Sequence, residues 1–158
     1  MRTSARIAGV GLALCLAGAG CGDTAGDAGA STGDAAASKP AGAMVKVVSS
    51  RYGKVVADSK GEALYLFTKD GRGRSQCYGT CAKAWPPFLS KGKPRAGKGI
   101  NASGLGTRKR SDGKLQVTYK GQPLYYYVAD KPGLILCQDV FEYGGRWLIL
   151  RPSGKLVR

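Results

Sequence analysis

The chain has 158 residues, with 25 Lys and Arg against 10 Asp and Glu, so its formal net charge is +15. This length allows one domain or two very small ones. The sequence contains no histidine, which excludes Ser-His-Asp and Cys-His nucleophilic sites, His-containing zinc and blue-copper sites, and c-type haem attachment. We therefore expect a protein that is not an enzyme and that holds no cofactor or metal.

Residues 1–20 have the features of a secretory signal peptide. Arg2 and Arg6 precede a short uncharged run rich in Ala, Leu and Gly, which is shorter than the about 20 apolar residues of a membrane-spanning helix. The run ends in small residues before Cys21. This ending resembles a bacterial lipobox, in which the cysteine is lipidated, although Gly18 stands where a leucine is usual. An ordinary cleavable signal peptide is the alternative.

Residues 21–43 begin with this cysteine and continue with little besides Gly, Ala, Ser, Thr and Asp. Such a composition cannot bury enough apolar surface to offset the entropy lost on ordering. We interpret the segment as a flexible tether, which as a random coil would span roughly 25 Å. A lipidated Cys21 followed by a tether predicts a domain outside the cytoplasm, anchored to the cell membrane or the outer membrane.

A ten-residue pattern occurs twice in the rest of the chain. Residues 61–70 and 121–130 share Gly, Leu, Tyr, an aromatic residue and Asp at identical spacing, and a cysteine lies seven residues after each Asp. The repeated motif consists of Tyr65, Phe67, Asp70, Tyr125, Tyr127 and Asp130. Two copies of one supersecondary unit explain this register. We place the repeats in residues 44–103 and 104–158.

The first repeat has the pattern of a β-hairpin over residues 54–68. Valines precede a turn cluster, Asp-Ser-Lys-Gly, and a strand rich in aromatic and branched residues follows it. In that strand Leu64 and Leu66 point to one face, and Tyr65 and Phe67 point to the other. The alternation therefore predicts an apolar leucine face and a separate aromatic face.

The sequence of the second repeat predicts a matching hairpin, in which residues 115–119 pair with residues 124–128 and residues 120–123 form the turn. We expect the two hairpin units to pack through their leucine faces as one small, mainly β domain. The aromatic faces either meet or line a groove between the halves. We expect Asp70 to accept a hydrogen bond from a nearby turn amide, as aspartate commonly does.

The exported part of the chain contains an odd number of cysteines. Cys77 and Cys81 are four residues apart, a spacing that permits a disulfide, and export favours oxidation. We expect a structural disulfide and a short helical turn that ends before Pro86, with Trp85 packed over the cysteines. Cys137 is then a free thiol. Pairing of Cys137 across the repeats is the alternative, and a three-thiolate metal site is less favoured because its spacing fits no ligand pattern.

These motifs resemble the bacterial secreted-repeat lipoproteins, a family of unknown function. The resemblance rests on the repeated Tyr-x-aromatic-x-x-Asp motif, the Cys77–Cys81 spacing with Ala-Lys-Ala-Trp-Pro-Pro after it, and Gly-Gly-Arg-Trp at 144–147. It covers roughly residues 53–155 and implies an envelope location without an assigned activity. Before Gly144 the chain is more apolar than the family pattern, which suggests a different packing or a partner surface.

Our leading hypothesis is a non-catalytic, lipid-anchored envelope protein that binds an anionic partner through basic loops at residues 71–74 and 91–110. The whole excess charge lies on residues 44–158, and so basic a domain attracts anions. The expected partner is an anionic envelope polymer or an acidic protein, and no nucleic acid is expected. The alternative is a redox, electron-transfer or cofactor-binding protein that uses the clustered tyrosines and cysteines, since tyrosine can ligate haem iron.

Overall fold

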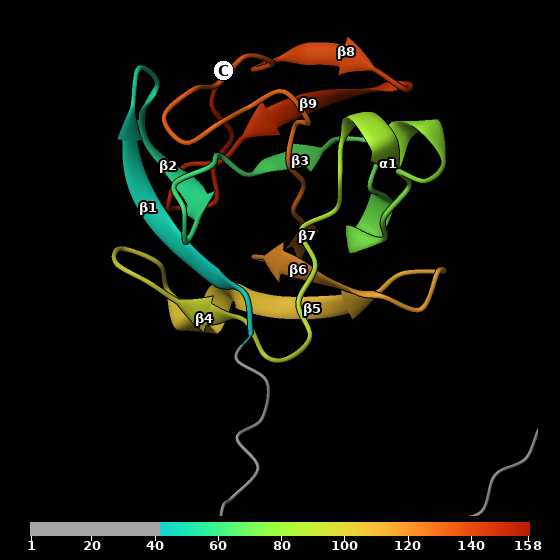
Figure 1. The fold of residues 1–158 in the computed structure, drawn as a ribbon, viewed down its shortest axis with the longest axis horizontal. Helices are drawn as coiled ribbons and strands as arrows, with labels where there is room; N and C mark the ends of the chain where they lie inside the picture. Colours follow the sequence, from blue (N-terminus) through green and yellow to red (C-terminus); the bar gives the residue numbers. More distant parts are fainter. Residues whose placement is uncertain (1–41) are drawn as a thin grey trace, which may run out of the picture. The chain divides into compact units, whose positions relative to one another are not determined.

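The structure, a computed structural model, describes residues 42–158 apart from the side chain of Arg72. The predicted signal peptide, the predicted lipidation site Cys21 and nearly all of the tether lie outside these residues. Between residues 42 and 158 no helix is long and apolar enough to cross a membrane. This part of the chain is mainly β, as predicted, with three small sheets and one short α-helix (Figure 1).

The first sheet is a long hairpin with one added strand. β1 (Met44–Ser50) pairs antiparallel with β2 (Gly53–Asp58), and β4 (Arg95–Ala96) adds in parallel to the start of β1. Valines make up much of β1 and β2, and branched residues favour strands because they pack well on a pleated surface. The β2 valines and the alanine after them are fully buried, so this hairpin contributes one wall of the core.

The second sheet has the order β5-β6-β7. β5 (Leu105–Lys109) pairs with β6 (Leu115–Tyr119), and a two-residue turn leads from β6 to β7 (Gln122–Pro123). Both turn residues, Lys120 and Gly121, have positive φ angles, 50° and 81°. A type I′ turn requires this combination, so the chain reverses here because a glycine is available.

The motif strands pair differently from the prediction. β2 takes β1 as its strand partner, and it meets the following segment through a bridge between Ala57 and Ala63 and through backbone hydrogen bonds, from Asp58 to Glu62 and from Leu64 to Val56. In the second repeat the predicted reversal after β6 is present, but the returning strand ends at residue 123, and residues 124–128 are held by bridges and single hydrogen bonds. The alternation predicted correctly which residues share a face, but it carries no information on which strand lies alongside.

The motif strand of the first repeat pairs with the second repeat. β3 (Tyr65–Phe67) is antiparallel to β9 (Gly145–Ile149), with Phe67 opposite Trp147, and β8 (Val140–Glu142) covers the other edge of β9. In Figure 1 these strands lie at the opposite end of the domain from β5 and β6. β3, in the first repeat, therefore pairs with a strand of the second repeat that lies more than 70 residues further along the chain.

The motif segment of the second repeat makes the equivalent contact with the first. Tyr125 lies opposite Pro87, the Tyr126 amide donates to the Pro86 carbonyl oxygen at 2.9 Å, and the Val128 amide donates to Ala84 at 3.0 Å. Each repeat thus lays its motif strand against the tryptophan-containing segment of the other. The two repeats are interlocked by this exchange.

The predicted disulfide and short helix are present. Cys77 and Cys81 are bonded, with their Cα atoms 5.3 Å apart. α1 (Thr80–Ala84) starts after Gly79, whose φ of 57° favours glycine, and it ends before the two prolines, which have no amide to donate. The disulfide lies in one buried cluster with Trp85, as expected.

Leucine and aromatic side chains sort into two cores. One cluster contains Leu64, Leu66, Phe88, Leu124 and Leu150. The other contains Tyr65, Phe67, Trp85, Tyr125 and Trp147. The predicted contact between leucine faces is therefore confirmed. The aromatic faces meet and are buried against each other, so they do not line a groove.

A column of four aromatic rings runs through the second core. Phe67 stacks on Trp147, and Trp147 stacks on Trp85, with ring centres 4.1 Å apart in both pairs. Tyr127 lies tilted against the far side of Trp85 at 4.7 Å. Rings from the first and the second repeat alternate along the column, so neither repeat has this core by itself.

Replacing Trp147 with alanine should lower the free energy of unfolding by about 3–5 kcal/mol, because it removes a fully buried ring from the middle of the column. Phe141→Ala is the matched control, since Phe141 is 67% exposed and its loss should change stability by less than about 0.5 kcal/mol. Urea denaturation followed by circular dichroism measures both. A small loss for Trp147→Ala would contradict the column as the centre of the core.

Candidate functional site

The repeated motif lies at the contact between the two repeats. At its centre Tyr65 and Tyr125 lie opposite each other. The Tyr65 amide donates to the Tyr125 carbonyl oxygen at 2.8 Å, and the Tyr125 amide donates back to Tyr65 at 2.9 Å. The pair is the point about which the two repeats are approximately symmetric.

The side chains of the motif are reciprocal as well. The Tyr65 hydroxyl donates to Asp130 Oδ2 at 2.6 Å, and the Tyr125 hydroxyl donates to Asp70 Oδ2 at 2.7 Å. The remaining oxygen of each aspartate accepts a backbone amide from the loop that follows it, at 2.7 and 3.0 Å, as expected for Asp70. Each carboxyl group therefore joins its own loop to a tyrosine of the other repeat.

Burial raises the pKa of both carboxyl groups. Asp70 and Asp130 are 5% and 6% exposed. Loss of solvent raises the pKa of Asp70 to about 6, against the opposing effects of the bonds from Tyr125 and Gln76 and the charge of Arg110. The same desolvation raises the pKa of Asp130. Because both carboxyl groups are buried and hydrogen-bonded to the two repeats, we interpret them as structural links between the repeats.

Two arginines make a second reciprocal contact. Arg51, in the turn between β1 and β2, donates to the Ile135 carbonyl oxygen of the second repeat at 2.5 Å. Arg110, which follows β5, donates to the Cys77 carbonyl oxygen of the first repeat at 2.8 Å. Sequence reasoning missed both residues, because a single arginine at the end of a strand carries no pattern that identifies its acceptor.

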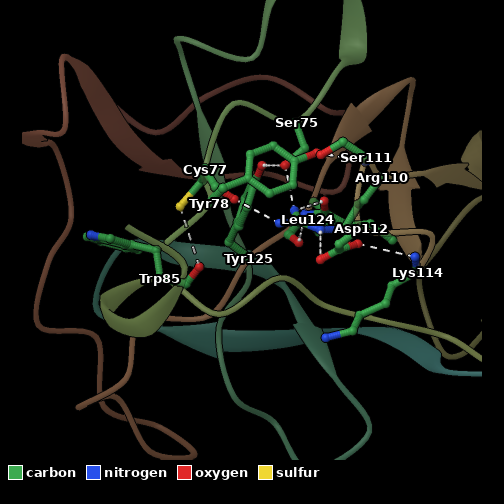
Figure 2. A network of polar contacts seen from close by, with 11 residues as sticks. Ser75, Cys77, Tyr78, Trp85, Arg110, Ser111, Asp112, Lys114, Leu124 and Tyr125 are labelled. Atoms are coloured by element: carbon green, nitrogen blue, oxygen red, sulfur yellow. Dashed lines mark hydrogen bonds and ion pairs between the residues drawn. The ribbon is translucent and has the colours of Figure 1, made fainter. Parts of the chain in front are cut away.

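Arg110 is deeply buried, and Figure 2 shows its contacts. Its side chain is 2% exposed. Nη1 donates to Ser75 Oγ at 2.5 Å and to Gln116 Oε1 at 2.7 Å, while Nε lies 3.4 Å from Asp112 Oδ2. The guanidinium carbon is 4.3 Å from the centre of the Tyr78 ring. Such a set of partners is what a buried cation requires.

Ser75 connects this arginine to the repeated motif. Its Oγ lies 2.6 Å from the Tyr125 hydroxyl, and that hydroxyl donates to Asp70. Arg110, Ser75, Tyr125 and Asp70 therefore form one continuous hydrogen-bonded chain.

A surface hollow beside this network collects basic side chains from both repeats. Its lining consists of Arg74, Ser75, Gln76, Tyr78, Arg108, Lys109 and Ser111. We call it the basic hollow. Arg74 follows the 3-10 turn Gly71–Gly73, and the other two cations lie on β5. The two segments predicted to form basic loops, 71–74 and 91–110, thus meet here.

The third cysteine is a separate feature. Within residues 42–158, Cys137 is the one cysteine outside a disulfide, and it is half-buried against the aromatic core. Burial raises the pKa of its thiol. The alternative that Cys137 pairs across the repeats is wrong, because Cys77 is bonded to Cys81. In the same range, no group of three His, Cys, Asp or Glu residues is placed to hold a metal.

The extra apolar residues before Gly144 divide into two groups. Ile135 is buried in the aromatic core. Leu134, Leu136, Phe141 and Tyr143 are between 42% and 67% exposed. The predicted difference in packing therefore concerns one inward-pointing residue, while the others lie on the surface of the second repeat.

Removing either motif hydroxyl should have the same effect. Tyr65→Phe and Tyr125→Phe should each lower the free energy of unfolding by about 1–3 kcal/mol, because each leaves one oxygen of a buried aspartate without its donor. Tyr143→Phe is the control, since its ring is 42% exposed. Chemical denaturation compares the three. A loss confined to one of the two motif tyrosines would contradict the reciprocal arrangement.

Stability should fall as the pH rises through about 6. The pKa of Asp70 is 3.8 without burial and about 6 in the folded protein, so between these values the folded state keeps a proton that the unfolded chain has lost. The contribution is fully present below the lower value and disappears above the higher one. Asp70→Asn, which imitates the neutral group, should flatten the profile in denaturation experiments at stepped pH. An unchanged slope in this variant would show that Asp70 is not responsible.

Comparison with known families agrees with the repeats seen in the structure. A family profile described as a secreted repeat of unknown function matches residues 46–88 and 106–150. Comparison with curated proteins and with solved structures gave no match. The two matched segments together make up more than half of the chain and contain both copies of the motif. The chain therefore belongs to the family of secreted repeats of unknown function, whose description places it outside the cytoplasm.

Proposed function

We propose that the protein is a non-catalytic, lipid-anchored component of the cell envelope that binds an anionic partner outside the cytoplasm. The family description supports the location. The sequence supports the anchor, because Cys21 follows small residues at the end of a signal-like segment and precedes a Gly/Ala/Ser-rich tether.

The basic hollow is the observation that carries the anionic partner. Arg74, Arg108 and Lys109 are exposed, and the lining contains no carboxylate. Of the two ion pairs found within residues 42–158, one joins Arg110 to Asp112 beneath the hollow and the other joins Arg146 to Asp139, so neither involves Arg74, Arg108 or Lys109. Three cations held together without a neutralising acid attract counter-ions and anionic ligands.

Several carboxylates of the domain are already engaged in structure. Asp70 and Asp130 join the repeats. Asp58 Oδ1 accepts three backbone amides of the turn after β2, each at 2.9 Å, and Asp139 pairs with Arg146 at 2.9 Å. Few acids therefore remain to offset the positive surface, which supports binding of a polyanion over binding of a cation.

Replacing Cys21 with serine should release the protein from membranes into the soluble extracytoplasmic fraction of bacteria that process lipoproteins. Cys15→Ser is the matched control and should leave the protein anchored, because the large Leu14 precedes Cys15. Both are measured by fractionation after a high-salt wash, which removes proteins held by charge alone. Retention of the Cys21 variant in washed membranes would contradict the anchor.

The second test concerns the partner. The purified protein should bind anionic polymers or vesicles at low ionic strength and leave neutral ones unbound, with affinity that falls steeply as salt is added. Absence of binding to any polyanion at low salt would contradict the proposal.

Electron transfer is a second candidate, which the aromatic column favours. Trp147 and Trp85 are stacked, and half-buried Tyr127 extends the column toward the surface, where Cys137 packs against the same cluster. The absorption spectrum, metal content and thiol count of protein purified from membranes distinguish this candidate. A bound chromophore or redox metal would favour it over anion binding.

A further inference from the structure

We propose that the basic hollow is a binding site for the phosphate groups of an anionic polymer, with Arg74 and Arg108 as its main ligands; the inference rests on the proposed function and assigns its site. Guanidinium groups offer paired donors that match the oxygens of a phosphate. Lys109 adds a third positive charge, which suits a ligand that carries a series of negative charges.

The floor of the hollow is held in place before any ligand binds. Arg110 lies under it and donates to Ser75, and its guanidinium lies over the ring of Tyr78. The Ser111 amide donates to the Tyr78 hydroxyl at 3.1 Å, and Figure 2 shows these side chains gathered around Arg110. Binding therefore costs little ordering of the floor, and only the exposed rim cations lose freedom.

The two sides of the hollow come from different repeats and lie in contact. Gly73 has a φ of 70°, and a Cβ built on it would be 3.7 Å from Arg108 Nε. The side chain of Arg108 on β5 therefore reaches the segment that carries Arg74. The exchange between the repeats brings the cations within reach of one ligand.

Internal symmetry shows that the fold does not require the charge of this loop. The loop after Asp70 contains Arg74, Ser75 and Gln76, and the corresponding loop after Asp130 contains Leu134, Ile135 and Leu136. Both loops donate an equivalent amide to their aspartate. The position of Arg74 is thus taken by Leu134 in a loop that makes the same amide contact, so this contact does not require the charge of Arg74.

The lining also distinguishes a polymer from a membrane surface. Peripheral proteins that bind bilayers combine cations with apolar side chains that enter the lipid. Tyr78 is the one aromatic residue of the lining, and its ring is occupied by Arg110. Leu115 is exposed and lies opposite Lys109 on β6, but neither Leu115 nor the exposed Val128, Leu136 and Phe141 line the hollow. These observations favour a water-soluble phosphate polymer over phospholipid headgroups.

The experiment measures binding of inorganic polyphosphate to the purified full-length mature protein, by titration calorimetry. Arg74→Gln/Arg108→Gln should weaken binding about tenfold or more and reduce the salt dependence by about two charges. Lys60→Gln/Lys131→Gln removes the same charge from exposed positions outside the hollow and should change the affinity less than about threefold. Arg74→Lys/Arg108→Lys keeps the charge and should give an intermediate affinity.

Four outcomes would overturn the inference, and they are distinguishable. Equal weakening by the two glutamine pairs would show diffuse attraction, and the proposed anion binding would survive without this site. Equal binding of polyglutamate would remove the preference for phosphate, and binding of phosphatidylglycerol vesicles in place of polyphosphate would assign the hollow to membranes. Failure of the unmodified protein to bind any of the three probes would overturn the proposed function itself. Circular dichroism confirms that each variant is folded.

Discussion

Each repeat of this protein buries a carboxyl group that accepts a hydrogen bond from a tyrosine of the other repeat. Asp70 accepts from Tyr125, and Asp130 accepts from Tyr65. Leaving a buried acceptor without a hydrogen-bond partner lowers the free energy of unfolding by a large fraction of a small domain's total stability. The tyrosine and the aspartate of one motif are therefore not partners of each other, although they lie five residues apart. At this spacing, each of them bonds to the other repeat instead.

The remaining features depend on this exchange. It brings Trp85 and Trp147 together in the middle of the aromatic column, and it places Arg110 beneath a loop of the first repeat. It also brings Arg74 to β5 and so forms the basic hollow. The symmetric parts of the interface hold the domain together, while the parts that differ between repeats, the loops after Asp70 and Asp130, are where binding can be specialised.

Sequence patterns predicted the features that depend on neighbouring residues. Alternation separated Leu64 and Leu66 from Tyr65 and Phe67, and the spacing of two cysteines predicted the disulfide. Strand partners could not be predicted in the same way, because period-two alternation shows which face is buried and not which strand lies alongside. The basic loops were recognisable by composition, but they meet at one hollow only because the repeats exchange contacts. The acceptors of Arg110 that belong to the first repeat could not be predicted for the same reason.

The most direct test of this account is to separate the repeats. Residues 42–103 and 104–158 should each lack native near-ultraviolet circular dichroism when produced alone, because each would expose half of the aromatic column and an aspartate without its tyrosine donor. Mixing them in equal amounts should restore the spectrum of the intact domain. Native-like folding of either fragment alone would show that the repeats do not depend on one another and would contradict the account.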